Sequence, residues 1–200
     1  MPQSSETRPH STDLQPAYPE YSPDERALLL RLAQQAIRAK LEGANLPQPL
    51  ASAHLSELRG AFTTLYLNGK LRGCVGYPMA ILPLYQTVIE TAQAAAFDDP
   101  RFAPVSIGEA GDLTMSLSVL SPLRAIAAEQ VEVGRHGLVI SHAGRRGLLL
   151  PQVAVEHGWD RVTFLEQTCR KAGLPENAWR EGAVIEAFTA EVFGDAGCAA

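Results

Sequence analysis

The chain has 200 residues, of which 46% are hydrophobic, and its 22 acidic and 17 basic residues give a formal net charge of −5. This length and composition suffice to bury a sizeable core without disulfides or metals, and the acidic balance provides no overall field that attracts nucleic acid or an anionic membrane. No apolar run approaches the roughly 20 residues that span a bilayer, and no signal sequence is recognised, so we expect a cytoplasmic protein.

The N-terminal segment, residues 1–22, contains four prolines and no hydrophobic period. This pattern predicts a disordered tail. Ser22, Pro23 and Glu25 then form the pattern of a capping box with proline at the first helical position. We therefore expect a helix from Pro23 to Glu42.

A hairpin is expected next. Residues 61–67 are rich in β-branched and aromatic side chains, which favour a strand. Asn68-Gly69 is a strong hairpin signal because both positions tolerate positive φ, so residues 70–76 should return as a second strand. The helical spacing of apolar residues after Pro83 then stops before Pro100, because proline disfavours helix in the residue that precedes it.

The second half begins with another strand. Residues 113–119 alternate apolar and hydroxyl side chains, which predicts one buried face. A second hairpin is expected, with strands at residues 138–141 and 148–150 and a tip at residues 143–147.

Helices and a last strand complete the chain. Pro151 should open a short helix that ends at Gly158, Asp160 should cap the next helix, and residues 183–193 should form a final strand. Since strands and helices do not alternate strictly, we predict an α+β fold with a mixed, largely antiparallel sheet and flanking helices.

The returning strand of the first hairpin holds the strongest candidate site. In a regular strand Arg72 and Cys74 share a face, and a nearby guanidinium favours the nucleophilic thiolate. Gly73 and Gly76 leave room for a ligand to approach the backbone, although either glycine equally indicates a bulge that ends the shared face. The competing interpretation is a free cysteine that packs as a small hydrophobe.

Three further residues are candidates for this site. Asp99 and Arg101 follow a predicted helix, in a loop position where site residues are common; their alternative role is helix termination with a local turn contact. His136 is a candidate general base for Cys74, with hydrogen-bonded scaffolding as its alternative. The candidate catalytic residues are thus Cys74 and His136, and the candidate substrate-binding residues are Arg72, Gly73, Gly76, Asp99 and Arg101.

We expect no metal site and no cofactor. The spacing of the histidines and of the three cysteines matches no metal-binding pattern, and no glycine-rich phosphate loop is present. Arg145-Arg146 is interpreted as a solvated hairpin tip, so neither a nucleic-acid nor a membrane partner is expected.

The segment Leu71-Arg-Gly-Cys-Val-Gly76 resembles the signature hexapeptide of the AMMECR domain family, in which the fifth position is usually isoleucine. Further blocks resemble the family in the same order, namely Asp99-Pro-Arg-Phe102, Glu132-Val-Gly-Arg-His-Gly137, Leu148-Leu-Leu-Pro-Gln-Val-Ala154, Glu156-His-Gly-Trp-Asp160 and Cys169-Arg-Lys-Ala-Gly-Leu174. The resemblance implies one domain over residues 23–195, with a larger sheet-containing part and a smaller adjoining subdomain.

The chain is similar to the prokaryotic, AmmeMemoRadiSam-associated version of this family, which implies a Memo-like protein and a radical SAM enzyme as partners. The resemblance transfers no reaction. One hypothesis is a component of a cytoplasmic modification pathway that binds a small or peptide-like substrate in a cleft at the Arg72/Cys74 hairpin. The alternative is a non-enzymatic adaptor or scaffold in which this hairpin is purely structural.

Overall fold

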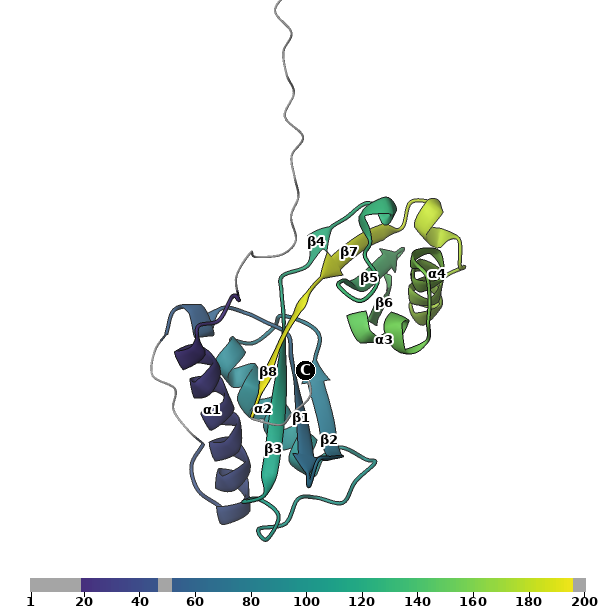
Figure 1. Cartoon of the computed structure of the whole chain (residues 1–200). Coiled ribbons are helices and arrows are strands. Elements are labelled where there is room, and N and C mark those ends of the chain that lie inside the picture. Colours follow the sequence, from purple (N-terminus) through teal and green to yellow (C-terminus); the bar gives the residue numbers. More distant parts are fainter. Residues whose placement is uncertain (1–18, 47–51, 196–200) are drawn as a thin grey trace, which may run out of the picture.

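Two antiparallel sheets of four strands each organise the chain (Figure 1). The structure is a computed structural model and describes residues 19–46 and 52–195. Helices accompany both sheets, so the predicted α+β class is confirmed. Within the described residues, no helix is long and apolar enough to cross a membrane.

The larger part is built on the sheet with strand order β2-β1-β3-β8. Its elements are α1 (Pro23–Glu42), the short 3-10 helix η1 (His54–Ser56), β1 (Ala61–Leu67), β2 (Lys70–Tyr77), α2 (Leu84–Phe97), β3 (Leu113–Leu120) and β8 (Ala190–Gly194). Both long helices share one core cluster with the alternate apolar residues of β1 and β3, such as Leu65 and Leu117, which are fully buried. Since α1 and α2 pack on the same face, neither of these helices covers the opposite face of this sheet.

Local signals explain why the first elements form where they do. The Ser22 Oγ accepts a hydrogen bond from the Glu25 N–H, and the Glu25 carboxylate accepts one from the Ser22 N–H, which confirms the capping box and the helix from Pro23 to Glu42. Asn68 and Gly69 have φ of 51° and 73°, as the first hairpin requires.

The end of the predicted tail at residue 22 is wrong. Residues 1–18 of the predicted tail lie outside the described residues, but Tyr21 is 1% exposed and its ring stacks on that of His54. The Glu20 N–H also donates to the Glu191 carboxylate of β8 at 2.7 Å. The folded part therefore begins before residue 22. The sequence did not indicate this, because Tyr21 lies in a proline-rich stretch and its stacking partner His54 is far along the chain.

The smaller part is built on the sheet with strand order β4-β7-β5-β6. Its elements are β4 (Arg124–Ala125), η2 (Ala128–Gln130), β5 (Gly137–His142), β6 (Arg145–Leu149), α3 (Pro151–Glu156), α4 (Arg161–Lys171), η3 (Ala178–Arg180) and β7 (Val184–Phe188). Leu138 and Ile140 pack with Phe164 and Leu165 of α4 on one face. On the other face, Val139 and Phe188 form a cluster with Leu120 at the junction with the larger part.

The predicted tip of the second hairpin, at residues 143–147, is wrong in its bounds. The second hairpin turns within Ala143 and Gly144, which have φ of 48° and 79°, so Arg145 and Arg146 lie in β6 rather than in the tip. Alanine rarely adopts positive φ, and the turn therefore gave no sequence signal.

The predicted strand at residues 183–193 is really two strands in two different sheets. β7 and β8 are separated at Thr189, whose N–H donates to the Ser121 Oγ at 3.0 Å, while the Ser121 N–H donates to the Thr189 carbonyl at 2.9 Å. Figure 1 shows β7 and β8 leading from the smaller sheet into the larger one. The two chain crossings between the parts are thus tied to each other.

Candidate functional site

Cys74 lies in β2, the edge strand of the larger sheet, and its side chain is partly buried. The backbone register places it opposite Thr64 of β1, which in turn lies opposite Ser116 of β3. The Thr64 Oγ1 donates a hydrogen bond to the Cys74 Sγ at 3.3 Å. Because Val75 packs toward the helices and strand side chains alternate, the thiol belongs to the face that α1 and α2 leave open.

Asp99 and Arg101 hold the outer edge of β2 at Cys74. The Asp99 Oδ2 accepts the Cys74 N–H at 2.9 Å, and the Arg101 Nη2 reaches the Cys74 carbonyl at 3.5 Å. The Arg101 Nε and Nη2 bind both oxygens of Asp99, at 3.0 and 2.7 Å. The hydrogen bonds from Arg101 hold the pKa of this buried carboxyl well below its usual range. We call this arrangement the Asp99–Arg101 clamp, and it unites three of the predicted residues.

Arg72 does not extend this arrangement as predicted. A β-bulge shifts the register between Leu65 and Tyr66, which pair with Gly73 and Leu71, and leaves Arg72 as the extra residue. The alternation that was expected to set Arg72 beside Cys74 is therefore interrupted, and that prediction is wrong. The Arg72 guanidinium instead binds the Glu109 carboxylate, with Nε–Oε1 at 3.0 Å and Nη2–Oε2 at 3.3 Å.

Glu109 was missed in the sequence, because nothing local relates it to β2. Hydrogen bonds from the Arg72 side chain lower the pKa of Glu109 to about 2, with further contributions from the backbone and hydroxyl of Ser106. Together with the Asp99–Arg101 clamp, this ion pair fixes the loop after α2 along the edge of β2.

The Arg72–Glu109 pair should make stability depend on acid pH. A carboxyl whose pKa is lowered on folding stabilises the folded state above its unfolded pKa, and this contribution is lost as pH falls from 4.5 through about 2. We expect wild-type protein to lose on the order of 1 kcal/mol more unfolding free energy over this window than Glu109→Gln. Urea unfolding at several pH values measures this difference. Glu42→Gln, at an exposed position of α1, should leave the pH dependence of wild type unchanged, and equal profiles for all three proteins would contradict the assignment.

The two glycines of the hexapeptide have packing roles. A Cβ on Gly73 would lie 2.1 Å from the Ala95 carbonyl oxygen of α2, and one on Gly76 would lie 2.2 Å from the Phe62 ring. The space that was expected to admit a ligand at Gly73 and Gly76 is therefore filled by protein atoms. Glycine is needed here for the close approach of β2 to α2 and for the seat of the Phe62 ring.

His136 is placed in the smaller part, directly before β5, and is 2% exposed. Its Nδ1 accepts the Glu132 N–H at 3.1 Å, and burial lowers its pKa. In the part of the chain that the structure describes, no hydrogen bond joins His136 to Cys74. The predicted Cys/His pairing is thus not formed in the structure, and the observed partner of His136 is a backbone group of its own loop.

A cavity of about 350 Å³ lies at the junction of the two parts and was not predicted. We call it the junction cavity. Gly60 and residues 78–80 line it at the ends of β1 and β2, Leu120 lines it at the end of β3, and Glu186 and Phe188 line it from β7. No local sequence pattern could have indicated it, because its walls come from segments far apart in the chain. Pro78, which lines it directly after the end of β2, lies four residues beyond Cys74 in the chain.

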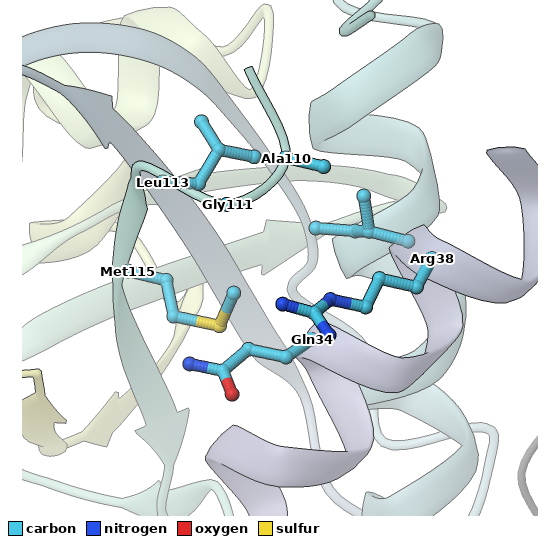
Figure 2. Close-up of a pocket in the computed structure, with 7 residues that line it drawn as sticks. Gln34, Arg38, Ala110, Gly111, Leu113 and Met115 are labelled. Carbon is cyan, nitrogen blue, oxygen red and sulfur yellow. The ribbon is translucent and has the colours of Figure 1, made fainter. Parts of the chain in front are cut away.

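A second, smaller cavity separates α1 from the start of β3 (Figure 2). Gln34 and Arg38 of α1 extend toward Leu113 and Met115 in this view. Its volume is about 80 Å³, well below the several hundred Å³ typical of ligand sites. It offers no nucleophile, and we do not assign the site to it.

Within residues 19–46 and 52–195, one group of side chains has the spacing of metal ligands. Ligand atoms of Glu20, His54 and Glu57 lie within 4.8 Å of one another. The Arg59 guanidinium, however, bridges Glu20 and Glu57 at 2.5 and 2.8 Å. A cation of the protein itself thus already neutralises these carboxylates, and this cluster serves to anchor the segment around Tyr21.

Comparison with known proteins places these features in a wider group. The family model described as AMMECR1 matches residues 30–193. Protein MK0488 of Methanopyrus kandleri is 41% identical over 182 residues, covering 85% of this chain and 88% of its own, and a protein of Methanothermobacter thermautotrophicus is 40% identical, covering 90% and 99%. The crystal structure of uncharacterized protein PH0010 from Pyrococcus horikoshii superimposes with a TM-score of 0.68 at 41% identity, covering 84% of this chain and 90% of that one.

Proposed function

Because the chain belongs to the AMMECR1 family, over residues 30–193, we propose that it binds a small or peptide-like substrate along β2, between the Cys74 thiol and the junction cavity. One observation carries the proposal: a partly exposed thiol on the open sheet face is held by its backbone on one side and by a hydroxyl donor on the other. A binding or catalytic site needs side chains that are held in fixed positions by neighbouring hydrogen bonds, as Cys74 is here.

Each residue of the site has a role in this proposal. Cys74 supplies the reactive sulfur, as a nucleophile or as a redox-active thiol, and the hydrogen bond from Thr64 orients it. Arg101, whose side chain is 55% exposed, orients an anionic group of the substrate. Asp99 positions both Cys74 and Arg101. Arg72, bound by Glu109, supports the strand from the side.

The thiol assignment is tested by alkylation in a Cys198→Ser background, which leaves two cysteines to compare. We expect iodoacetamide to modify Cys74 at least about tenfold faster than Cys169, which is fully buried and whose pKa burial raises. Peptide mass spectrometry measures both rates. Thr64→Val should change the Cys74 rate, whereas Thr163→Val, on α4 of the smaller part, should not.

Two results would remove the thiol from the proposal. One is that Cys74 remains as unreactive as Cys169 in the folded protein. The other is that Cys74 reacts at the rate of a free cysteine and is insensitive to Thr64→Val, since a catalytic sulfur depends on the groups that hold it.

We also propose that the chain works in a modification pathway with a Memo-like protein and a radical SAM enzyme, as its resemblance within the family implies. Co-purification of the tagged chain with each protein expressed alongside it tests this directly. Recovery of neither protein from the paired expression would count against this part of the proposal.

A non-enzymatic adaptor is the second candidate, and two observations favour it. Gly73 and Gly76 serve packing, and the exposed apolar side chains of Leu58, Met79 and Ile81 lie at and beside the rim of the junction cavity. For an adaptor, Cys74→Ser should keep both partner binding and pathway activity, whereas Met79→Asp should abolish them. For a thiol-dependent protein, Cys74→Ser should abolish activity while partner binding is kept.

A further inference from the structure

We propose that Cys198 is the resolving partner of Cys74, and that the two thiols close to a disulfide across the larger sheet when a peroxide oxidises Cys74. The chain has three cysteines. Cys169 is fully buried in the core of the smaller part, which leaves Cys198 as the partner for Cys74 within one chain. Cys198 follows the last described residue, Asp195, by three positions, so its reach is set by where Asp195 is held.

One row of paired residues crosses the larger sheet from Cys74 to the end of β8. Cys74 pairs with Thr64, Thr64 with Ser116, and Ser116 with Gly194. Neighbouring strands lie about 4.7–4.9 Å apart, so the two ends of the row are about 14–15 Å apart. The side chains between them, a threonine and a serine, lie on the face that α1 and α2 leave uncovered. Both are small, and a chain can cross the sheet above them.

Asp195 marks the point where the chain leaves this sheet. Its N–H donates to the Met115 carbonyl at 3.0 Å. The Met115 N–H donates in return to the Asp195 Oδ2, also at 3.0 Å, where a continuing strand would offer its own carbonyl. The carboxylate thus ends the ladder one residue after β8. It holds the segment that carries Cys198 beside the row that begins at Cys74.

The segment after Asp195 is long enough to return to Cys74, with little to spare. An extended chain spans at most about 3.3–3.6 Å per residue, so Cys198 lies within about 10–11 Å of Asp195. A disulfide joins Cα atoms that are up to about 7 Å apart. Together these lengths exceed the roughly 15 Å from Asp195 to Cys74 by about 2 Å, less than the rise of one residue. The intervening Ala196 and Gly197 have the smallest side chains, which suits a segment lying on the sheet.

The reaction needs one oxidant, a peroxide. The Cys74 sulfur attacks the peroxide, whose O–O bond breaks as an S–O bond forms, and the leaving oxygen takes the thiol proton to give water or an alcohol. The Cys198 sulfur then attacks the sulfenic sulfur of Cys74, an S–S bond replaces the S–O bond, and hydroxide leaves with the Cys198 proton as water. Two thiols are oxidised to one disulfide while the two peroxide oxygens are reduced. A thiol reductant restores both thiols by exchange.

This inference rests on the proposed function, because it takes Cys74 as the reactive thiol and assigns its regulation. The disulfide withdraws the sulfur from the substrate until it is reduced. The alkylation test of the proposed function uses Cys198→Ser, in which the partner is missing. Fast alkylation of Cys74 in that variant, without a link to Cys198 in wild type, defeats this inference alone. A Cys74 that is inert in that variant defeats the thiol role in the proposed function.

The experiment treats the full reduced chain with hydrogen peroxide at low protein concentration and maps disulfides by peptide mass spectrometry. Trypsin places the three cysteines in three different peptides. We expect a Cys74–Cys198 link within monomers, with about one peroxide consumed per link. The iodoacetamide reaction of Cys74 should be lost with the link and return with dithiothreitol. In Cys198→Ser, dimedone should trap at least about tenfold more sulfenic acid at Cys74 than in wild type.

The length of the segment provides a test that is specific to the crossing of the sheet. Deletion of Ala196 and Gly197 places the cysteine directly after Asp195, about 4 Å short of the reach that a disulfide with Cys74 needs. The yield of the link should then fall at least about tenfold. The matched control, Ala196→Ser with Gly197→Ser, keeps the length and should keep the link.

Five results would overturn the proposal. Cys74 is not oxidised by peroxide, or its sulfenic acid persists in wild type without a link. The link joins two copies of the chain, with a yield that rises with protein concentration. Cys169 takes the place of Cys198 in the link. The deletion variant forms the link as fast as wild type does.

Discussion

Gly73→Ala is expected to lower the free energy of unfolding by about 3 kcal/mol or more. The added Cβ would lie 2.1 Å from the Ala95 carbonyl oxygen. That oxygen belongs to the backbone of α2, so relief requires the helix or β2 to move rather than a side chain to rotate. Urea unfolding followed by circular dichroism measures the loss.

Gly111→Ala provides the matched control for Gly73→Ala. A Cβ at Gly111 has no atom within 4 Å, and its φ is not positive. It should cost little or even stabilise by reducing the entropy of the unfolded chain. If both variants unfolded alike, the close approach of β2 to α2 would not be what requires glycine in the hexapeptide.

Asp99→Ala is expected to lower the free energy of unfolding by about 1–3 kcal/mol, because it leaves the Cys74 N–H without its acceptor. Asp99 is 5% exposed and also accepts the Arg101 N–H at 3.1 Å. Asp99→Asn should lose less, since an amide oxygen still accepts one hydrogen bond. Thermal unfolding gives the stability, and hydrogen exchange should show faster exchange at the Cys74 amide in Asp99→Ala.

The neighbouring carboxylate supplies the control for Asp99. Asp98 is 66% exposed at its side chain and lies 3.7 Å from Lys40, so Asp98→Ala should change stability by less than about 0.5 kcal/mol. Normal protection of the Cys74 amide in Asp99→Ala would mean that the Asp99–Arg101 clamp does not hold the strand.

Elements whose signals are local could be predicted from the sequence. The capping box at Ser22 and the turn at Asn68-Gly69 were sufficient because each depends on neighbours a few residues away. Ala143 and Thr189 could not be interpreted in the same way. Ala143 adopts positive φ without being glycine or asparagine, and Thr189 marks a change of sheet that only the pairing with Ser121 reveals.

The same division holds for the candidate site. The loop of Asp99 and Arg101 was named as a candidate beside Cys74, and the structure joins these residues by hydrogen bonds. Arg72 was misplaced because a bulge depends on the register with β1, which one strand does not encode. His136 has its observed partner in its own loop. The junction cavity could not be predicted from the sequence, because its walls come from both parts and their arrangement in space has to be known.

The pairing of Ser121 with Thr189 has a consequence for the order in which the chain folds. β3 and β8 are neighbours in the larger sheet, yet the whole smaller sheet is encoded between them. The sequence of the smaller part thus lies between two neighbouring strands of the larger sheet, and the chain enters and leaves it at two adjacent points that are hydrogen-bonded to each other. β8 follows the whole smaller part in the sequence. The larger sheet therefore cannot be completed until the smaller part and residues 190–194 have been synthesised.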